Sequence, residues 1–175
     1  DQTLEQVLHA AMYAPTRAGS RPWHFVVIRR DDIKRALAGA LRMPAERLSA
    51  PVLVAVCAET AASGEWDLDA AAATENLLVA ATALGLGSAW LASQISNYWS
   101  TVDRTFRQIV GAPDNVELVA LIALGYPAEK PAPHRIEDRY DSSRVHFENM
   151  AGLAQETEQF AQRRTGDWRQ GISTE

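Results

Sequence analysis

The sequence predicts a single α/β or α+β domain, because helical and extended patterns alternate along most of the chain. Two nearly continuous apolar runs, 50–59 and 116–127, are typical of strands that are buried on both faces. The alanine-rich stretch 65–87 is the longest helical pattern, and its small side chains favour burial on most sides of the helix. With 175 residues, the chain is long enough for one domain to bury a sizeable core.

The remaining elements follow from local patterns. Apolar residues spaced three and four positions apart predict a first helix that Pro15 ends: Leu4, Val7, Leu8, Ala11 and Met12. Gly85 and Gly87 are expected to end the alanine-rich helix. The other predicted elements are a strand at 24–30, a helix at 31–41, a short extended segment at 88–93 and a helix at 101–113.

The C-terminal tail, 141–175, is polar and carries one sparse apolar stripe. The stripe consists of Met150, Leu153, Thr157 and Phe160. A single stripe of this kind more often docks on another surface than folds alone. We therefore expect the tail to pack on a partner.

Bulk properties exclude several classes of protein. The net charge of −5 argues against nucleic acid or an anionic membrane as the main partner, since both favour basic surfaces. One cysteine cannot form an internal disulfide, so a reducing, cytoplasmic setting is the expectation. No apolar run approaches the roughly 18 residues that cross a bilayer, and the first residues form an amphipathic helix rather than a signal peptide.

The titratable residues do not predict a metal site or a hydrolytic triad. The histidines His9, His24, His134 and His146 form no HxxxH or HxxEH pair, and Cys57 has no cysteine partner. No GxSxG motif is present, and Cys57 sits in the middle of an apolar strand. We expect Cys57 to be an inert core thiol.

Three turns have compositions that allow a ligand site. The segment 15–22 is longer than the roughly 2–6 residues that such a connection commonly uses, and it mixes hydroxyl, glycine and arginine residues. A Gly-x-Gly turn at 85–87 follows a helix, where a helix stop is the favoured explanation. A proline-rich loop carries Lys130, Arg135 and Arg139, which suits phosphate but equally a solvated surface.

Taken together and in this order, the three turns resemble the FMN-dependent nitroreductase family. YAPTRAGSRPWHFVVI, 13–28, is similar to the family pattern of Ala-Pro-Ser, small or polar residues, Gln-Pro-Trp and an apolar strand. DLDAAAATENLLVAATALGLGSAWLAS, 67–93, resembles the central helix followed by Gly-Leu-Gly-Ser/Thr-x-Trp-Ile-Gly. VELVALIALGYPAEKPAPHR, 116–135, resembles the last core strand and the basic loop after it. The resemblance runs from Leu4 to about Phe147.

The resemblance implies an α+β sandwich in which helices flank a mixed, mostly antiparallel sheet, in an intertwined homodimer or higher oligomer. It implies an FMN-binding domain at 1–147 and a C-terminal helical extension at 148–175 that packs on a partner subunit.

The resemblance also implies which residues meet the cofactor. The expected FMN contacts lie in the first loop, on the segment after the Gly-x-Gly turn, and in the basic loop: Thr16, Arg17, Gly19, Ser20, Arg21, Trp90, Leu91, Ala92, Ser93, Arg135 and Arg139. Arg139 fits the phosphate role better than Arg135. Tyr98 and Trp99 are candidates for covering a bound substrate, although aromatic packing at a helix start is an equal alternative.

The chain departs from the family pattern in two respects. Gly19 and Arg21 stand where asparagine and glutamine are usual, and Arg21 can still donate to flavin carbonyls. Family members also begin with an arginine-rich segment before the first helix, and the expectation is that the sequence at hand is truncated there.

The implied function is an FMN-dependent oxidoreductase that moves hydride through flavin N5 between a donor such as NAD(P)H and a small organic substrate. Alternatives are a biosynthetic oxidase that desaturates cyclic dipeptides and, in another class, a degenerate flavin-binding or assembly domain. A second subunit is a further candidate partner. The sequence assigns no residue as a general acid or base.

Overall fold

The structure, a computed structural model, describes residues 2–93, 97–129, 132–148 and 150. The chain divides into two units, Asp1–Lys130 and Pro131–Glu175. All the helices and strands named below belong to the first unit. They follow the order α1 (Gln2–Met12), β1 (Trp23–Ile28), α2 (Asp31–Leu41), β2 (Val52–Glu59), α3 (Trp66–Ala83), β3 (Gly87–Ser93), α4 (Trp99–Val110) and β4 (Val116–Gly125).

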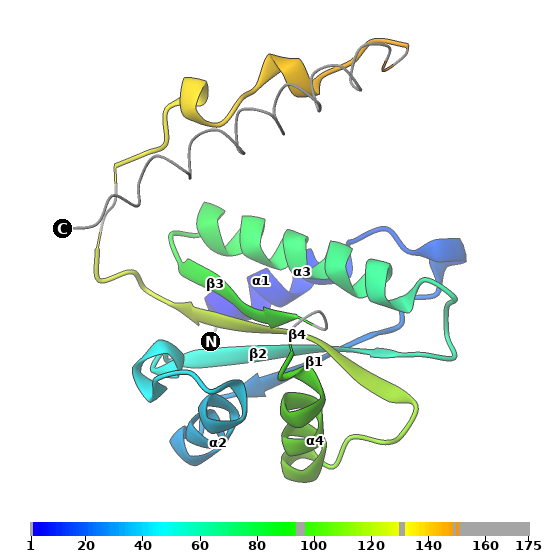
Figure 1. The fold of residues 1–175 in the computed structure, drawn as a ribbon, viewed down its shortest axis with the longest axis vertical. Coiled ribbons are helices and arrows are strands. Elements are labelled where there is room, and N and C mark those ends of the chain that lie inside the picture. Colours follow the sequence, from blue (N-terminus) through cyan, green and yellow to red (C-terminus); the bar gives the residue numbers. More distant parts are fainter. Residues whose placement is uncertain (1, 94–96, 130–131, 149, 151–175) are drawn as a thin grey trace, which may run out of the picture. The chain divides into compact units, whose positions relative to one another are not determined.

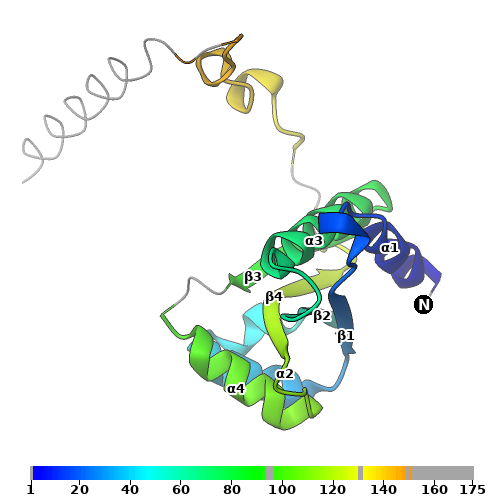
Figure 2. The same ribbon diagram turned by 90° about the vertical axis from the view of Figure 1, so that its right-hand side faces the viewer.

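The first unit is a three-layer sandwich with a sheet in the middle (Figure 1). The four strands lie in the order β1-β2-β4-β3, and every neighbouring pair is antiparallel. Figure 2 shows α1 beside α3 on one face of the sheet and α2 beside α4 on the other. The predicted α+β sandwich with a mostly antiparallel sheet is therefore confirmed.

Each face of the sheet carries its own apolar core. Strands β2 and β4 occupy the centre of the sheet and are buried along most of their length, as their continuous apolar sequences predict. Side chains alternate between the two faces, so Val54 and Val56 meet α1 and α3, whereas Leu53 and Cys57 face α2 and α4.

The alanine-rich helix differs from the prediction in one respect. It ends at Ala83, and Gly85 follows with a φ of 77°, a left-handed conformation that favours glycine, so the predicted helix stop is confirmed. Within one chain, however, α3 is buried on one side only, and Leu68 and Val79 on its outer side are exposed. The expectation of burial on most sides is wrong for the single chain.

The described part of the second unit, 132–148 and 150, contains two short 3₁₀ turns, Ile136–Asp138 and Ser142–Arg144, with no buried residue in either. Apolar side chains of this unit are exposed: Ile136, Tyr140, Val145, Phe147 and Met150. Of the predicted tail stripe, Leu153, Thr157 and Phe160 lie outside the described residues. The proposed division at 147/148 stays a prediction.

Candidate functional site

The loop between α1 and β1 has an unusual backbone. Its 3₁₀ turn, Arg17–Gly19, contains Ala18 at a φ of 51°, and Arg21 has a φ of 48°. Left-handed backbone is unfavourable for residues with a Cβ atom and persists only where the surroundings hold it. Gly19, at a φ of 73°, faces open space, because a Cβ atom built there meets no atom within 4 Å.

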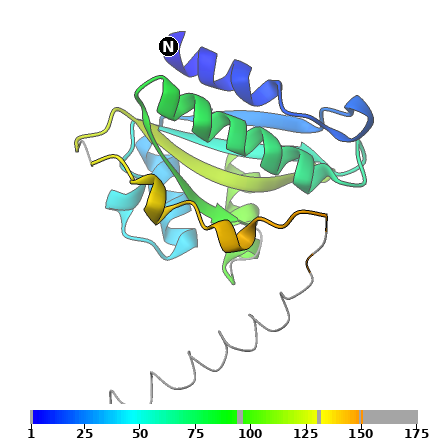
Figure 3. The ribbon, with the colours of Figure 1, turned by 90° about the horizontal axis from the view of Figure 1, so that it is seen from above.

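Asp69, in the first turn of α3, holds this loop. Its Oδ1 accepts a hydrogen bond from the backbone N–H of Arg17 at 2.9 Å, and its Oδ2 accepts one from the hydroxyl of Ser20 at 3.1 Å. The Asp69 residue is only 5% exposed, and a buried carboxylate is tolerated when both oxygens are bonded. In Figure 3 the loop lies at the end of α3 where that helix begins. Asp69 thereby fixes the strained turn from a position some fifty residues later in the sequence.

The hydroxyl groups of the loop differ in what they can still bind. Thr16 Oγ1 accepts a hydrogen bond from the backbone N–H of Arg21 at 3.3 Å, which leaves the O–H of Thr16 as a donor. Ser20 donates its only hydroxyl proton to Asp69 and keeps acceptor capacity. The Arg17 guanidinium lies 3.5 Å from Glu65 in an exposed pair, a type that adds little stability.

A cavity of about 440 Å³ opens beside the loop, at the end of α1. It is lined by His9, Met12, Tyr13, Ala14 and Arg21. Its volume falls in the range of sites for small organic ligands. Among the residues described, the Arg21 side chain forms no hydrogen bond or ion pair, so its guanidinium is available to a ligand in this cavity.

The predicted segment Trp90–Ser93 lies on β3, at the opposite edge of the sheet from β1. Trp90 faces Ile122 and Ala92 faces Leu121, so the register shifts by one residue at Leu91. Ser93 and the start of β1 lie at the same end of the sheet, but β2 and β4 separate them. Three strand spacings of about 4.8 Å amount to roughly 14 Å, so the two segments do not form one site through direct contact within a single chain.

The predicted phosphate residues, Arg135 and Arg139, lie in the second unit. The Nε atom of Arg135 is 3.4 Å from Glu137 and 3.7 Å from Asp138, so acidic neighbours offset its charge. Arg139 instead lies 2.8 Å from Nε2 of His134. Arg139 therefore keeps more of its positive charge for a phosphate, in line with the preference from sequence.

The two aromatic candidates at the start of α4 have different surroundings. Trp99 is 7% exposed in the core, and its Nε1 has no hydrogen-bond partner in the part of the chain that is described. Tyr98 is partly exposed, and the guanidinium of Arg42 lies 4.7 Å from the centre of its ring. The burial of Trp99 agrees with aromatic packing at a helix start, which the sequence allows as an alternative to substrate contact. Substrate contact by either residue stays a prediction.

Cys57 is the inert core thiol that the sequence predicts. It is buried between the sheet and α4, and burial, with a smaller effect of Asp103, raises the pKa of the thiol to about 12. Across the described residues, no group of three His, Cys, Asp or Glu side chains is arranged to hold a metal ion. None of the helices in the described part of the chain is long and apolar enough to cross a membrane.

Comparison with known proteins identifies the family. The family model for the nitroreductase family matches residues 1–66 and 48–126, which together span most of the first unit. The chain belongs to the nitroreductase family.

Individual relatives resemble this chain in sequence and in structure. A protein of Archaeoglobus fulgidus, provisionally named NADH dehydrogenase/NAD(P)H nitroreductase, is 32% identical over 154 residues, 85% of this chain and 86% of the relative. The structure of an FMN-dependent nitroreductase from Clostridium difficile matches with a TM-score of 0.78 at 27% identity and covers 86% of this chain and 88% of its own. A provisionally named nitroreductase from Desulfovibrio desulfuricans, solved in complex with FMN, matches with a TM-score of 0.67 at 25% identity over 86% of each chain.

The sequence predicts that the loop between α1 and β1 contacts a ligand, but it does not reveal that Asp69 holds this loop. Asp69 is visible in the sequence as an acid near the start of a helix, where the helix dipole favours a negative charge. Its bonds to Arg17 and Ser20 connect segments far apart in the chain, and no local pattern reveals them.

Proposed function

We propose that this chain is an FMN-dependent oxidoreductase that passes hydride between NAD(P)H and a small organic substrate. The observation that carries the proposal is the strained loop Thr16–Arg21, which Asp69 fixes beside a cavity in a chain of the nitroreductase family. The family relatives described above, one FMN-dependent and one solved with FMN, support the choice of cofactor.

The residues of the first loop fit a flavin. Arg21 brings a positive charge and several N–H donors to the cavity, and Thr16 keeps a hydroxyl donor. Gly19 leaves room for close approach of a ligand to the backbone. We assign these residues, with Arg17 and Ser20, to the flavin ring and its ribityl chain, and the amide N–H of Ala92 or Ser93 on the edge strand to N5.

The phosphate is assigned to Arg139, with Arg135 as the second choice, because Arg139 is less neutralised by acidic neighbours. When bound, FMN supplies the hydride chemistry at N5. The residues of this chain position the ligand, and the charge of Arg21 favours the anionic reduced state.

A homodimer is part of the proposal. The loop and the β3 segment lie at opposite edges of one sheet, so a second copy is needed to bring such segments to one ligand. Two observations support it: the apolar outer side of α3 and the exposed apolar residues of the second unit, which include Phe147 and Met150. We propose that the extension 148–175 packs on this partner subunit.

The test uses the purified full-length protein. We expect a yellow protein with about one FMN per chain, released by heat and identified by its spectrum, and we expect NADH or NADPH to bleach it without oxygen. A protein that stays colourless after incubation with FMN would favour the assembly role and contradict the proposal. A bound flavin that neither NADH nor NADPH reduces, but that a cyclic dipeptide bleaches, would instead support the oxidase that desaturates cyclic dipeptides.

A further inference from the structure

A second cleft, of about 330 Å³, lies on the face of the sheet that is covered by α2 and α4. It is lined by residues of β1, the end of β2, the last turns of α4, the loop 111–115 and the first residue of β4, Val116. Its floor is apolar: Cys57 and Phe106 are 1% exposed, and Val26 and Val110 are partly buried. Burial keeps the thiol of Cys57 protonated by raising its pKa to about 12, so the floor carries no charge. The cleft is on the opposite face from α1 and α3, where the proposed flavin loop is held.

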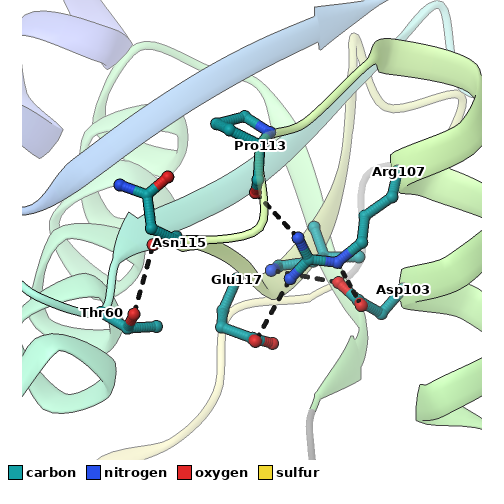
Figure 4. Close-up of polar contacts among 7 residues, drawn as sticks. Thr60, Asp103, Arg107, Pro113, Asn115 and Glu117 are labelled. Atoms are coloured by element: carbon teal, nitrogen blue, oxygen red, sulfur yellow. Dashed lines mark hydrogen bonds and ion pairs between the residues drawn. The ribbon is translucent and has the colours of Figure 1, made fainter.

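The wall of this cleft is held in place by Arg107 of α4 (Figure 4). Its guanidinium donates to the carbonyl oxygen of Pro113 at 2.9 Å and to Asp103 at 2.6 Å, and it pairs with Glu117 at 3.2 Å. The cleft is therefore formed before any ligand arrives, which lowers the entropy cost of binding.

The loop between α4 and β4 also forms hydrogen bonds with Thr60, which directly follows β2. The backbone N–H and the hydroxyl of Thr60 both donate to the carbonyl oxygen of Asn115, at 2.9 and 3.3 Å, as Figure 4 shows for the hydroxyl. Bonds from both sides thus hold the segment 113–115 in one position.

The mouth of the cleft carries one carboxylate whose charge is poorly compensated. Oε1 of Glu59 lies 3.2 Å from Nε2 of His24, and the Glu59 side chain is 44% exposed. Among the described residues, Oε2 of Glu59 is in no hydrogen bond, and no lysine or arginine lines the cleft. The nearby carboxylate of Glu117 is already paired with Arg107. The charge that a ligand meets at the mouth is therefore negative whenever His24 is neutral.

We propose that this cleft binds a small organic cation, a primary amine with a compact aromatic or branched alkyl body. The body lies on Val26, Cys57 and Phe106, and the ammonium group donates to Glu59. Apolar sites of this size with a single convergent polar group are typical of small-molecule binding. The inference stands independently of FMN and of the proposed hydride transfer.

The test is a titration of the full-length, methyl-labelled protein with benzylamine, followed by NMR. We expect saturable shifts of the methyl groups of Val26, Val110 and Val116, with a Kd on the order of 1 mM. Benzyl alcohol, of similar shape but uncharged, is expected to bind about fivefold more weakly, the scale of one half-exposed charge pair.

Two variants separate charge recognition from apolar contact. Glu59→Gln is expected to weaken benzylamine about fivefold and to leave benzyl alcohol unchanged. Glu5→Gln, which removes an exposed carboxylate from α1 on the other face, is the matched control and is expected to change neither. Equal affinities for the two probes, an unaffected Glu59→Gln variant, or shifts confined to other methyl groups would each overturn the proposal.

Discussion

Helices α3 and α4 cover opposite faces of one sheet, yet they are built in opposite ways. α3 buries mainly small side chains: Ala70, Ala73, Thr74, Leu77 and Ala81. α4 buries large ones: Trp99, Val102 and Phe106. Their outer sides differ as well: α3 exposes Leu68 and Val79 beside Glu75 and Thr82, whereas α4 exposes Ser100, Arg104 and Gln108 beside Ile109.

The difference concerns how many contacts each helix needs before its apolar residues are buried. The polar outer side of α4 is compatible with water, so its contact with the sheet completes its burial. α3 is apolar nearly all round, which is typical of a helix buried on both sides, and its alanines let neighbours approach closely. One chain supplies the sheet for its inner side, and we propose that a second copy covers its outer side.

The largest expected effect lies on the inner side of α4. Phe106→Ala removes a ring that is only 1% exposed and leaves a void that its neighbours fill only in part, so we expect it to lower the free energy of unfolding by about 3–5 kcal/mol. Urea denaturation followed by circular dichroism measures this loss. The control is Ile109→Ala on the exposed side of the same helix, with an expected loss below about 1 kcal/mol. Similar losses for the two variants would mean that α4 does not depend on its large buried side chains.

The second prediction concerns the outer side of α3. Val79→Asp places a carboxylate in the proposed subunit contact, and an unpaired buried charge costs about 3 kcal/mol, so we expect the dimer to weaken roughly a hundredfold. Light scattering over a dilution series measures the change in mass.

The matched control for this variant is Gln108→Asp on the outer side of α4, which is expected to leave the mass unchanged. A Val79→Asp protein that stays as large as the parent at every concentration would exclude the outer side of α3 from the interface.

The third prediction concerns the start of α3, where Asp69 holds the loop. Asp69→Ala removes two hydrogen bonds to a charged group, so we expect a loss of about 2 kcal/mol in the free energy of unfolding and a weaker hold on added FMN. Thermal unfolding and a fluorescence titration with FMN measure the two effects.

Asp67→Ala is the control for this change, because it removes an exposed acid from the same turn of α3 but leaves the loop contacts in place. We expect it to lose the helix-dipole contribution and the bond from the backbone N–H of Leu68, together about 1 kcal/mol, and to bind FMN normally. If both variants behave alike, the loop does not depend on Asp69.

Much of the fold could be predicted from local sequence, because helix and strand periods depend on neighbouring residues. The helix 31–41 has the predicted bounds, and the apolar runs at 50–59 and 116–127 contain β2 and β4. The order of the strands and the hold of Asp69 on the loop depend on contacts between distant segments, which no local pattern specifies.

The sequence predicts which segments contribute to the candidate site, but it does not predict how these segments are arranged in space. The loop residues lie together, but the segment 90–93 follows at the far edge of the sheet and the arginines lie in another unit. A family pattern lists residues that meet one ligand without stating which copy of the chain supplies each. The low exposure of Trp99 was likewise hidden, since an aromatic residue at a helix start suits a core and a ligand site equally well.

The smallest expected effect lies in the loop itself, at Arg21. Arg21 lines the cavity and its side chain has no partner among the described residues, so Arg21→Ala should leave the unfolding temperature within about 1 °C of the parent. FMN affinity should fall about tenfold, because a charged donor to the flavin is lost. Arg21→Lys keeps the charge without the planar donor fork and should lie between the two. Unchanged FMN affinity in both variants would remove Arg21 from the site, while Asp69 could still hold the loop for the backbone contacts alone.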